Sequence, residues 1–133
     1  MNLEILKIAS NTENFKDLKN YTHYSKSINP LCGDEIHIKL IINNQKIVDF
    51  GYQGKSCIYC QASASILSNK LVNFETMKIR DLCDYANTYF SEKKKNLKKE
   101  WKFLGKLLSQ KNTNRQQCIL LPFNALKKIV SNL

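Results

Sequence analysis

Arginine is scarce in this basic sequence. Only Arg80 and Arg115 stand among the 21 lysine and arginine residues, although the formal net charge is +10. Such a charge by itself favours a nucleic-acid partner. Proteins that recognise bases or phosphates specifically, however, tend to use the forked guanidinium group of arginine. We therefore expect no nucleic-acid partner, and keep nucleic-acid binding only as an alternative.

The sequence also lacks an apolar run long enough to cross a membrane, so we expect no membrane partner. The first residues, MNLEILKIAS, carry Glu4 inside a short apolar run, and we expect no signal peptide. The five cysteines are an odd number, which excludes a fully paired disulfide framework. We therefore expect a reducing, cytoplasmic environment in which thiols stay free for metal or persulfide chemistry.

The length of 133 residues predicts a single domain over residues 1–133. Alternating hydrophobic residues predict strands near 36–42 and 48–52, joined in an antiparallel hairpin at Asn43-Asn44. Helical spacing predicts helices over residues 12–24, 57–73, 76–90, 97–109 and 123–130, with loops at 25–30 and 111–114. Ser56 is expected to cap the second helix. The predicted fold class is α+β, a small antiparallel β-sheet with helices packed on one side.

Three cysteines lie in settings typical of a metal site. Cys32 and Asp34 are two residues apart in a loop, and we expect Gly33 to relieve crowding between them. Cys57 stands at the start of a predicted helix, where negative charge on a thiolate is stabilised. Cys118 precedes the last predicted helix. Three thiolates and a carboxylate form a four-ligand set for zinc or for iron in a cluster.

The other thiols, the histidines and the lysine cluster have simpler interpretations. Cys60 and Cys83 are expected to be small buried side chains, although Cys60 also forms a CxxC pair with Cys57. His23 and His37 are more often surface or packed residues than ligands. The lysine-rich segment at 93–102 is typical of a solvated helix face, with a docking surface for an acidic partner as the alternative.

Three segments in this order resemble the cysteine motifs of the IscU/NifU-N family of iron–sulfur cluster assembly proteins: NPLCGDEI, FGYQGKSCIYCQASASIL and RQQCILLPFNAL. The resemblance covers about residues 15 to 130. The chain looks most like the SufU branch, because the interval from Cys57 to Cys118 is long. Arg115 also matches an arginine that this branch carries three residues before its third cysteine. Two departures are Ser56, where the family usually has glycine, and Gln117, where the scaffold branch has histidine.

The resemblance implies an IscU/SufU-like domain that binds Zn²⁺ through Cys32, Asp34, Cys57 and Cys118. It also implies that Cys32 accepts persulfide sulfur from a SufS-type, PLP-dependent cysteine desulfurase. The protein would then be a sulfur relay, or sulfurtransferase, that works with that enzyme and with downstream Suf scaffold proteins. The main alternative is a scaffold that assembles a [2Fe–2S] cluster on the same ligands. A third alternative, from another class, is a structural zinc protein that binds nucleic acid.

Overall fold

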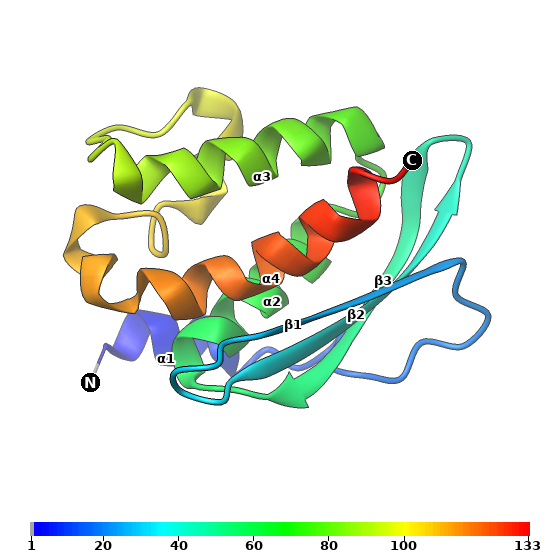
Figure 1. The fold of residues 1–133 in the computed structure, drawn as a ribbon, viewed down its shortest axis with the longest axis horizontal. Coiled ribbons are helices and arrows are strands. Elements are labelled where there is room, and N and C mark those ends of the chain that lie inside the picture. Colours follow the sequence, from blue (N-terminus) through cyan, green and yellow to red (C-terminus); the bar gives the residue numbers. More distant parts are fainter. Residues whose placement is uncertain (1) are drawn as a thin grey trace.

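The computed structural model describes residues 2–133 and contains one three-stranded sheet with helices packed on one side of it (Figure 1). Its elements in chain order are α1 (Leu3–Ala9), β1 (His23–Ile28), β2 (Glu35–Asn43), β3 (Lys46–Lys55), α2 (Ile58–Lys70), α3 (Thr76–Ser91), the 3₁₀ helices η1 (Lys99–Leu104) and η2 (Gln110–Arg115), and α4 (Gln116–Val130). The predicted α+β class is confirmed. No helix among the described residues is long and apolar enough to cross a membrane.

The sheet is antiparallel with the strand order β1-β2-β3, and β2 and β3 form the predicted hairpin. The turn lies at Asn44 and Gln45, one residue later than the predicted Asn43-Asn44, and these residues have φ angles of 51° and 64°. Positive φ at both central positions is the conformation of the two-residue turn that matches strand twist. Side chains of β2 alternate between a buried face and a partly exposed face. The buried face of the sheet therefore points toward the helices.

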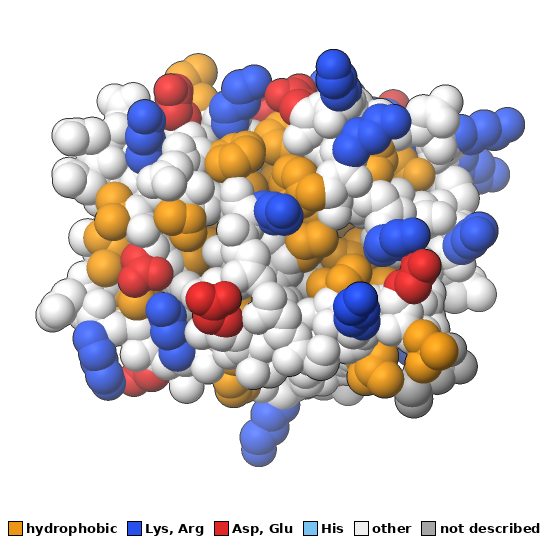
Figure 2. Space-filling view, turned by 180° about the vertical axis from the view of Figure 1, so that it is seen from behind, with side chains coloured by type: hydrophobic (Ala, Val, Ile, Leu, Met, Phe, Trp, Pro, Cys, Tyr) orange, Lys and Arg blue, Asp and Glu red, His pale blue; other side chains and the backbone are white. Residues whose placement is uncertain are grey.

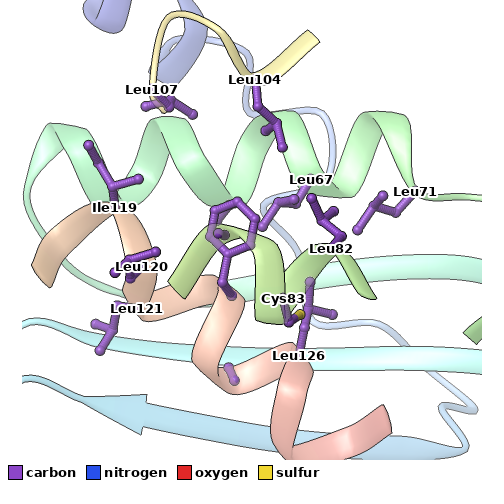
Figure 3. Close-up of a cluster of buried hydrophobic side chains, with 14 of the residues drawn as sticks. Leu67, Leu71, Leu82, Cys83, Leu104, Leu107, Ile119, Leu120, Leu121 and Leu126 are labelled. Carbon is purple, nitrogen blue, oxygen red and sulfur yellow. The ribbon is translucent and has the colours of Figure 1, made fainter. Parts of the chain in front are cut away.

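The hydrophobic core lies between the sheet and the helices (Figure 3). Leu67 from α2, Leu82 from α3 and Leu126 from α4 are fully buried there. Cys83 also lies in this core, as predicted for a small buried side chain. This core is assembled from all three long helices and therefore holds them against the sheet.

Helices α2 and α4 are joined by a hydrogen bond as well as by packing. Pro122 lies inside α4, where it has no N–H to donate and disturbs the preceding turn. The carbonyl of Ile119 in that turn accepts a hydrogen bond of 2.7 Å from the buried Ser63 hydroxyl of α2. The small residues Ala62, Ser63 and Ala64 leave room for this close approach. The beginning of α4 is thus fixed against α2.

The expectations for the first 30 residues were wrong. Residues 12–24 form no helix, because Asn14 and Lys16 hydrogen-bond to Tyr52 along the free edge of β3. Phe15 packs edge-on against Tyr52 and stays 44% exposed, so its spacing does not mark a buried helix face. The predicted loop at 25–30 is largely strand β1, whose core-facing positions are serines that give no hydrophobic alternation.

The expectations between α3 and α4 also need correction. The predicted helix at 97–109 is a series of 3₁₀ turns, with Trp101 at φ −110° interrupting η1. Trp101, Leu104 and Leu107 are nevertheless buried, and their spacing of three is the 3₁₀ period. The predicted loop at 111–114 is part of η2, and α4 begins at Gln116 rather than at residue 123. Ser56 makes no capping bond, because Cys57 is the N-cap residue of α2.

Charged side chains are dispersed over one face of the molecule. On the face turned away in Figure 1, lysine and arginine side chains are dispersed and alternate with acidic ones (Figure 2). Hydrophobic side chains are visible between them. This face therefore presents no continuous basic stripe of the kind that follows a nucleic-acid backbone.

Candidate metal centre

The β1–β2 loop, residues 29–34, presents Cys32 and Asp34. The Asn29 N–H donates to the Asp34 carbonyl and the Gly33 N–H donates to the Asn29 carbonyl, both at 2.8 Å. The Asn29 side chain also accepts from the Leu31 N–H at 3.0 Å. Gly33 has φ of 79°, and a Cβ there would meet no atom within 4 Å. Glycine is therefore required for its positive φ, not for the relief of crowding that we expected.

The start of α2 holds the carboxylate of Asp34. The backbone N–H of Cys57 donates to Asp34 Oδ2 at 3.1 Å. This N–H belongs to the N-cap residue of a 13-residue helix, whose first turn has unsatisfied donors and a positive dipole end. Gly54, just before it, has φ of 150°, and a Cβ there would lie 2.1 Å from the Glu35 carbonyl. Glycine at this position lets β3 approach β2 beside the site.

The first turn of α4 adds Cys118. Single ligand atoms from Cys32, Asp34 and Cys118 all lie within 4.8 Å of one another. The β1–β2 loop and the beginnings of α2 and α4 come together at the left end of the molecule in Figure 1. The fold therefore brings together three of the four predicted ligands, which are far apart in the sequence.

Cys57 lies beside this group but does not belong to it. Its backbone binds Asp34, and its half-buried thiol is close enough to affect Cys118. Burial raises the pKa of the Cys118 thiol far above its usual value, and the adjacent Cys57 thiol, the Asp34 carboxylate and the Cys32 thiol raise this pKa further. Four groups that can each become negative are thus crowded together, an arrangement that a bound cation would stabilise.

The remaining thiols differ from this group in burial. Cys60 is fully buried one turn after Cys57, and burial raises the pKa of its thiol to about 12. Burial likewise raises the pKa of Cys83 to about 12. Below these pKa values both side chains stay protonated and are poor nucleophiles. Cys60 adjoins the ligand group, since Cys57, Asp34 and Cys32 contribute to its pKa shift.

Arg115 stands at the N-cap of α4, three residues before Cys118. Its guanidinium group lies over the ring of Tyr59, at 5.4 Å from the ring centre. Since Tyr59 lies in the first turn of α2, Arg115 connects the beginning of α4 to the beginning of α2. Tyr59 had not been singled out from the sequence, where nothing distinguishes it from a core aromatic residue.

The histidines and the lysine-rich segment do not join the ligand group. His37 accepts or donates a bond with the Tyr24 hydroxyl at 2.6 Å, and His23 bonds Thr22 Oγ1 at 2.8 Å. In the segment 93–102, Lys94 and Lys98 lie over the Tyr85 ring at 4.5 and 5.2 Å. This segment is not the helix face that we expected, and its lysine stems partly pack on α3.

Comparison with known proteins places this chain in a family. A family model described as the NifU-like N terminal domain matches residues 3–88, which is more than half of the chain. The chain belongs to this family. Its members are iron–sulfur cluster assembly proteins. Cys32, Asp34 and Cys57 lie inside the matched region, and Cys118 lies beyond it.

Two relatives support membership of the NifU-like N-terminal domain family. An uncharacterized protein from Borreliella burgdorferi is 29% identical over 127 residues, spanning 96% of this chain and 79% of the relative. The iron–sulfur cluster assembly scaffold protein IscU from Streptococcus pyogenes serotype M1 is 28% identical over 106 residues. That match spans 77% of this chain and 65% of the relative, slightly less than two thirds of its length.

Solved structures share the fold. The N-terminal NifU-like protein from Brucella abortus superposes with a TM-score of 0.86 at 20% identity, covering 98% of this chain and 91% of that one. A SufU described as a putative scaffold protein, from Fervidobacterium islandicum AW-1, gives a TM-score of 0.85 at 20% identity, covering 98% and 96%. At this identity the likeness concerns the fold alone.

Proposed function

We propose that this protein accepts persulfide sulfur on Cys32 from a SufS-type cysteine desulfurase and passes it into iron–sulfur cluster assembly. The observation that carries the proposal is the exposed Cys32, whose thiol lies within 4.8 Å of ligand atoms of Asp34 and Cys118. Membership of a family of cluster assembly proteins supports the same process. Downstream Suf scaffold proteins would receive the sulfur.

The donor set fits a zinc ion. Donor atoms around a tetrahedral zinc lie roughly 3.3–3.8 Å apart, given ligand distances of about 2.0–2.3 Å. The observed group, within 4.8 Å, needs only a small contraction to reach that spacing. We propose Cys32, Asp34 and Cys118 as ligands, with Cys57 as the fourth after a turn of its side chain. When bound, the ion would hold these thiols as thiolates at neutral pH.

Individual residues of this chain have separate roles in the proposed sulfur transfer. The Cys32 thiolate attacks the outer sulfur of the donor persulfide, and a new S–S bond forms on Cys32. The donor S–S bond breaks, its inner sulfur leaves as a thiolate, and the proton stays on the outer sulfur, so no oxidant is consumed. Cys32 is suited to this role because it lies in an exposed loop, whereas Cys57 and Cys118 begin helices. Arg115 would offset the negative charge that develops on the leaving thiolate of the donor.

The second candidate is a scaffold that builds a [2Fe–2S] cluster on the same four residues. The Streptococcus relative, an iron–sulfur cluster assembly scaffold protein, favours it. Both functions use thiolates, because iron in clusters is also held by cysteine. They differ in cargo: a scaffold would gain iron and absorb visible light after assembly, whereas a sulfur relay would stay colourless.

The decisive experiment is single-turnover persulfide labelling with a SufS-type desulfurase and cysteine, followed by mass spectrometry of each thiol. We expect one added sulfur on Cys32 and about one zinc per chain in protein purified without oxygen. Cys32→Ala should abolish sulfur acceptance, and Cys57→Ser or Cys118→Ser should lower zinc content. Cys83→Ala is the matched control and should accept sulfur normally. Extra sulfur on Cys60 with Cys32 unmodified would contradict the proposal.

A further inference from the structure

The loop that carries Cys32 also carries the most exposed large hydrophobic side chain of the described residues. Leu31 is 91% exposed, and Ile28 at the other end of the loop is 49% exposed. Apolar side chains gain free energy when they leave water, and an isolated exposed leucine needs no explanation. An exposed leucine directly beside the exposed thiol of Cys32, the proposed sulfur acceptor, does need an explanation.

Leu31 is held in this position rather than left free to fold back. Asn29 is buried, and its side chain accepts the Leu31 N–H while its backbone bonds Gly33 and Asp34. The same three bonds that fix Cys32 and Asp34 therefore fix the direction of Leu31. Because the loop backbone is already ordered, a partner that covers Leu31 has to immobilise little more than its side chain, which favours binding.

Three basic residues lie near the loop that carries Leu31 and Cys32. Lys26 on β1 and Lys55 on β3 are exposed, and Arg115 precedes Cys118 by one helical turn. None of these three makes an ion pair with a carboxylate in the part of the chain that the structure describes. The complementary partner is a protein with an apolar pocket bordered by carboxylates.

We propose that Leu31 is the docking anchor for the enzyme that donates sulfur to Cys32. The inference rests on the proposed function, because a protein that brings its persulfide into bonding distance of Cys32 must cover the adjacent Leu31. The donor buries Leu31 in its apolar pocket while the surrounding basic residues meet its carboxylates. A buried anchor at the centre of an interface typically carries a large share of the binding free energy.

The test compares two sulfur donors on zinc-loaded, full-length protein: the desulfurase with cysteine, and cysteine persulfide as a small donor. For Leu31→Ser we expect the half-saturating acceptor concentration with the desulfurase to rise about tenfold or more. Labelling of Cys32 by cysteine persulfide and the zinc content should not change, because the side chain makes almost no contact within the protein. Leu31→Met should restore desulfurase transfer.

Met77→Ser is the matched control, since Met77 is 69% exposed at the beginning of α3, at the opposite end of the molecule (Figure 1). It should behave like the unmodified protein. Unchanged transfer in Leu31→Ser, or an equal loss with both donors, would overturn the docking role. So would a Leu31-dependent dimer, because the partner would then be a second copy of this chain. Failure of the unmodified protein to take sulfur from either donor would instead refute the proposed function.

Discussion

At the scale of single residues, Asp17 connects the irregular segment between α1 and β1 to the sheet. Its carboxylate accepts from Lys19 at 2.9 Å and from Lys39 on β2 at 2.5 Å. These bonds, chiefly the one from Lys39, lower the pKa of Asp17 from 3.8 to about 2. A lowered carboxyl pKa contributes stability that is present above pH 3.8 and is lost as pH falls toward 2.

We therefore predict that Asp17→Asn removes part of the acid sensitivity of folding. Urea unfolding between pH 5 and pH 2 should show a smaller loss of stability in Asp17→Asn than in the unmodified protein. The absolute effect should be small and should shrink in high salt, because Asp17 is exposed to solvent. Glu13→Gln, which removes a carboxylate without an ion pair among the described residues, is the control. Identical pH profiles for all three proteins would refute the prediction.

Individual site residues could be predicted from the sequence where side-chain chemistry alone indicates a metal ligand. Cys32, Asp34 and Cys118 were chosen because soft thiols and a carboxylate suit a metal, and the structure brings their ligand atoms together. The supporting residues were not predictable, because their roles come from backbone bonds. Asn29 holds the loop through its carbonyl, N–H and side chain, and nothing in its identity distinguishes it from the other asparagines.

At the scale of elements, the pairing of α2 with α4 sets the distance between two of the proposed ligands. The hydrogen bond from Ser63 to the Ile119 carbonyl joins the helices one residue after Cys118. We predict that Ser63→Ala lowers the free energy of unfolding by about 1 kcal/mol, since a buried carbonyl loses its side-chain donor.

The same Ser63→Ala substitution should weaken zinc binding several-fold, because the first turn of α4 can then shift relative to α2. Urea unfolding and a competition assay with a chelator measure the two effects. Ser91→Ala is the control, because the Ser91 hydroxyl is exposed and bonds only within its own helix. Full zinc affinity in Ser63→Ala would show that Ser63 serves stability alone.

Elements were predictable where the hydrophobic period was clear and burial was one-sided. The β2–β3 hairpin and α3 followed their patterns closely, because their apolar residues face the core. Strand β1 was missed because its core-facing residues are Ser25 and Ser27, which give no hydrophobic alternation. The start of α4 was placed too late because Pro122 normally ends a helix. In both cases tertiary packing outweighed the local preference of the sequence.

At the scale of the whole molecule, the site lies at one end of the hydrophobic core, and Cys57 and Cys118 pack against that core. The buried cluster extends from α1 through the sheet to α4 and contains no charged residue. The proposed ligands come from a loop and from two helix beginnings, and each is exposed or half-buried. A metal here would tie together segments that are already positioned by the core and by the bond from Ser63 to Ile119.

We predict that removing zinc with a chelator lowers the melting temperature but leaves the protein folded. Zinc binds the native state and so stabilises it in proportion to the logarithm of its free concentration above the dissociation constant. The melting temperature should therefore rise steadily as zinc is added back, while far-UV circular dichroism at room temperature stays constant. The double variant Cys32→Ser/Cys118→Ser should be folded and insensitive to zinc. Random-coil dichroism in the chelated protein would mean that the metal, and not the core between the sheet and the helices, determines the fold.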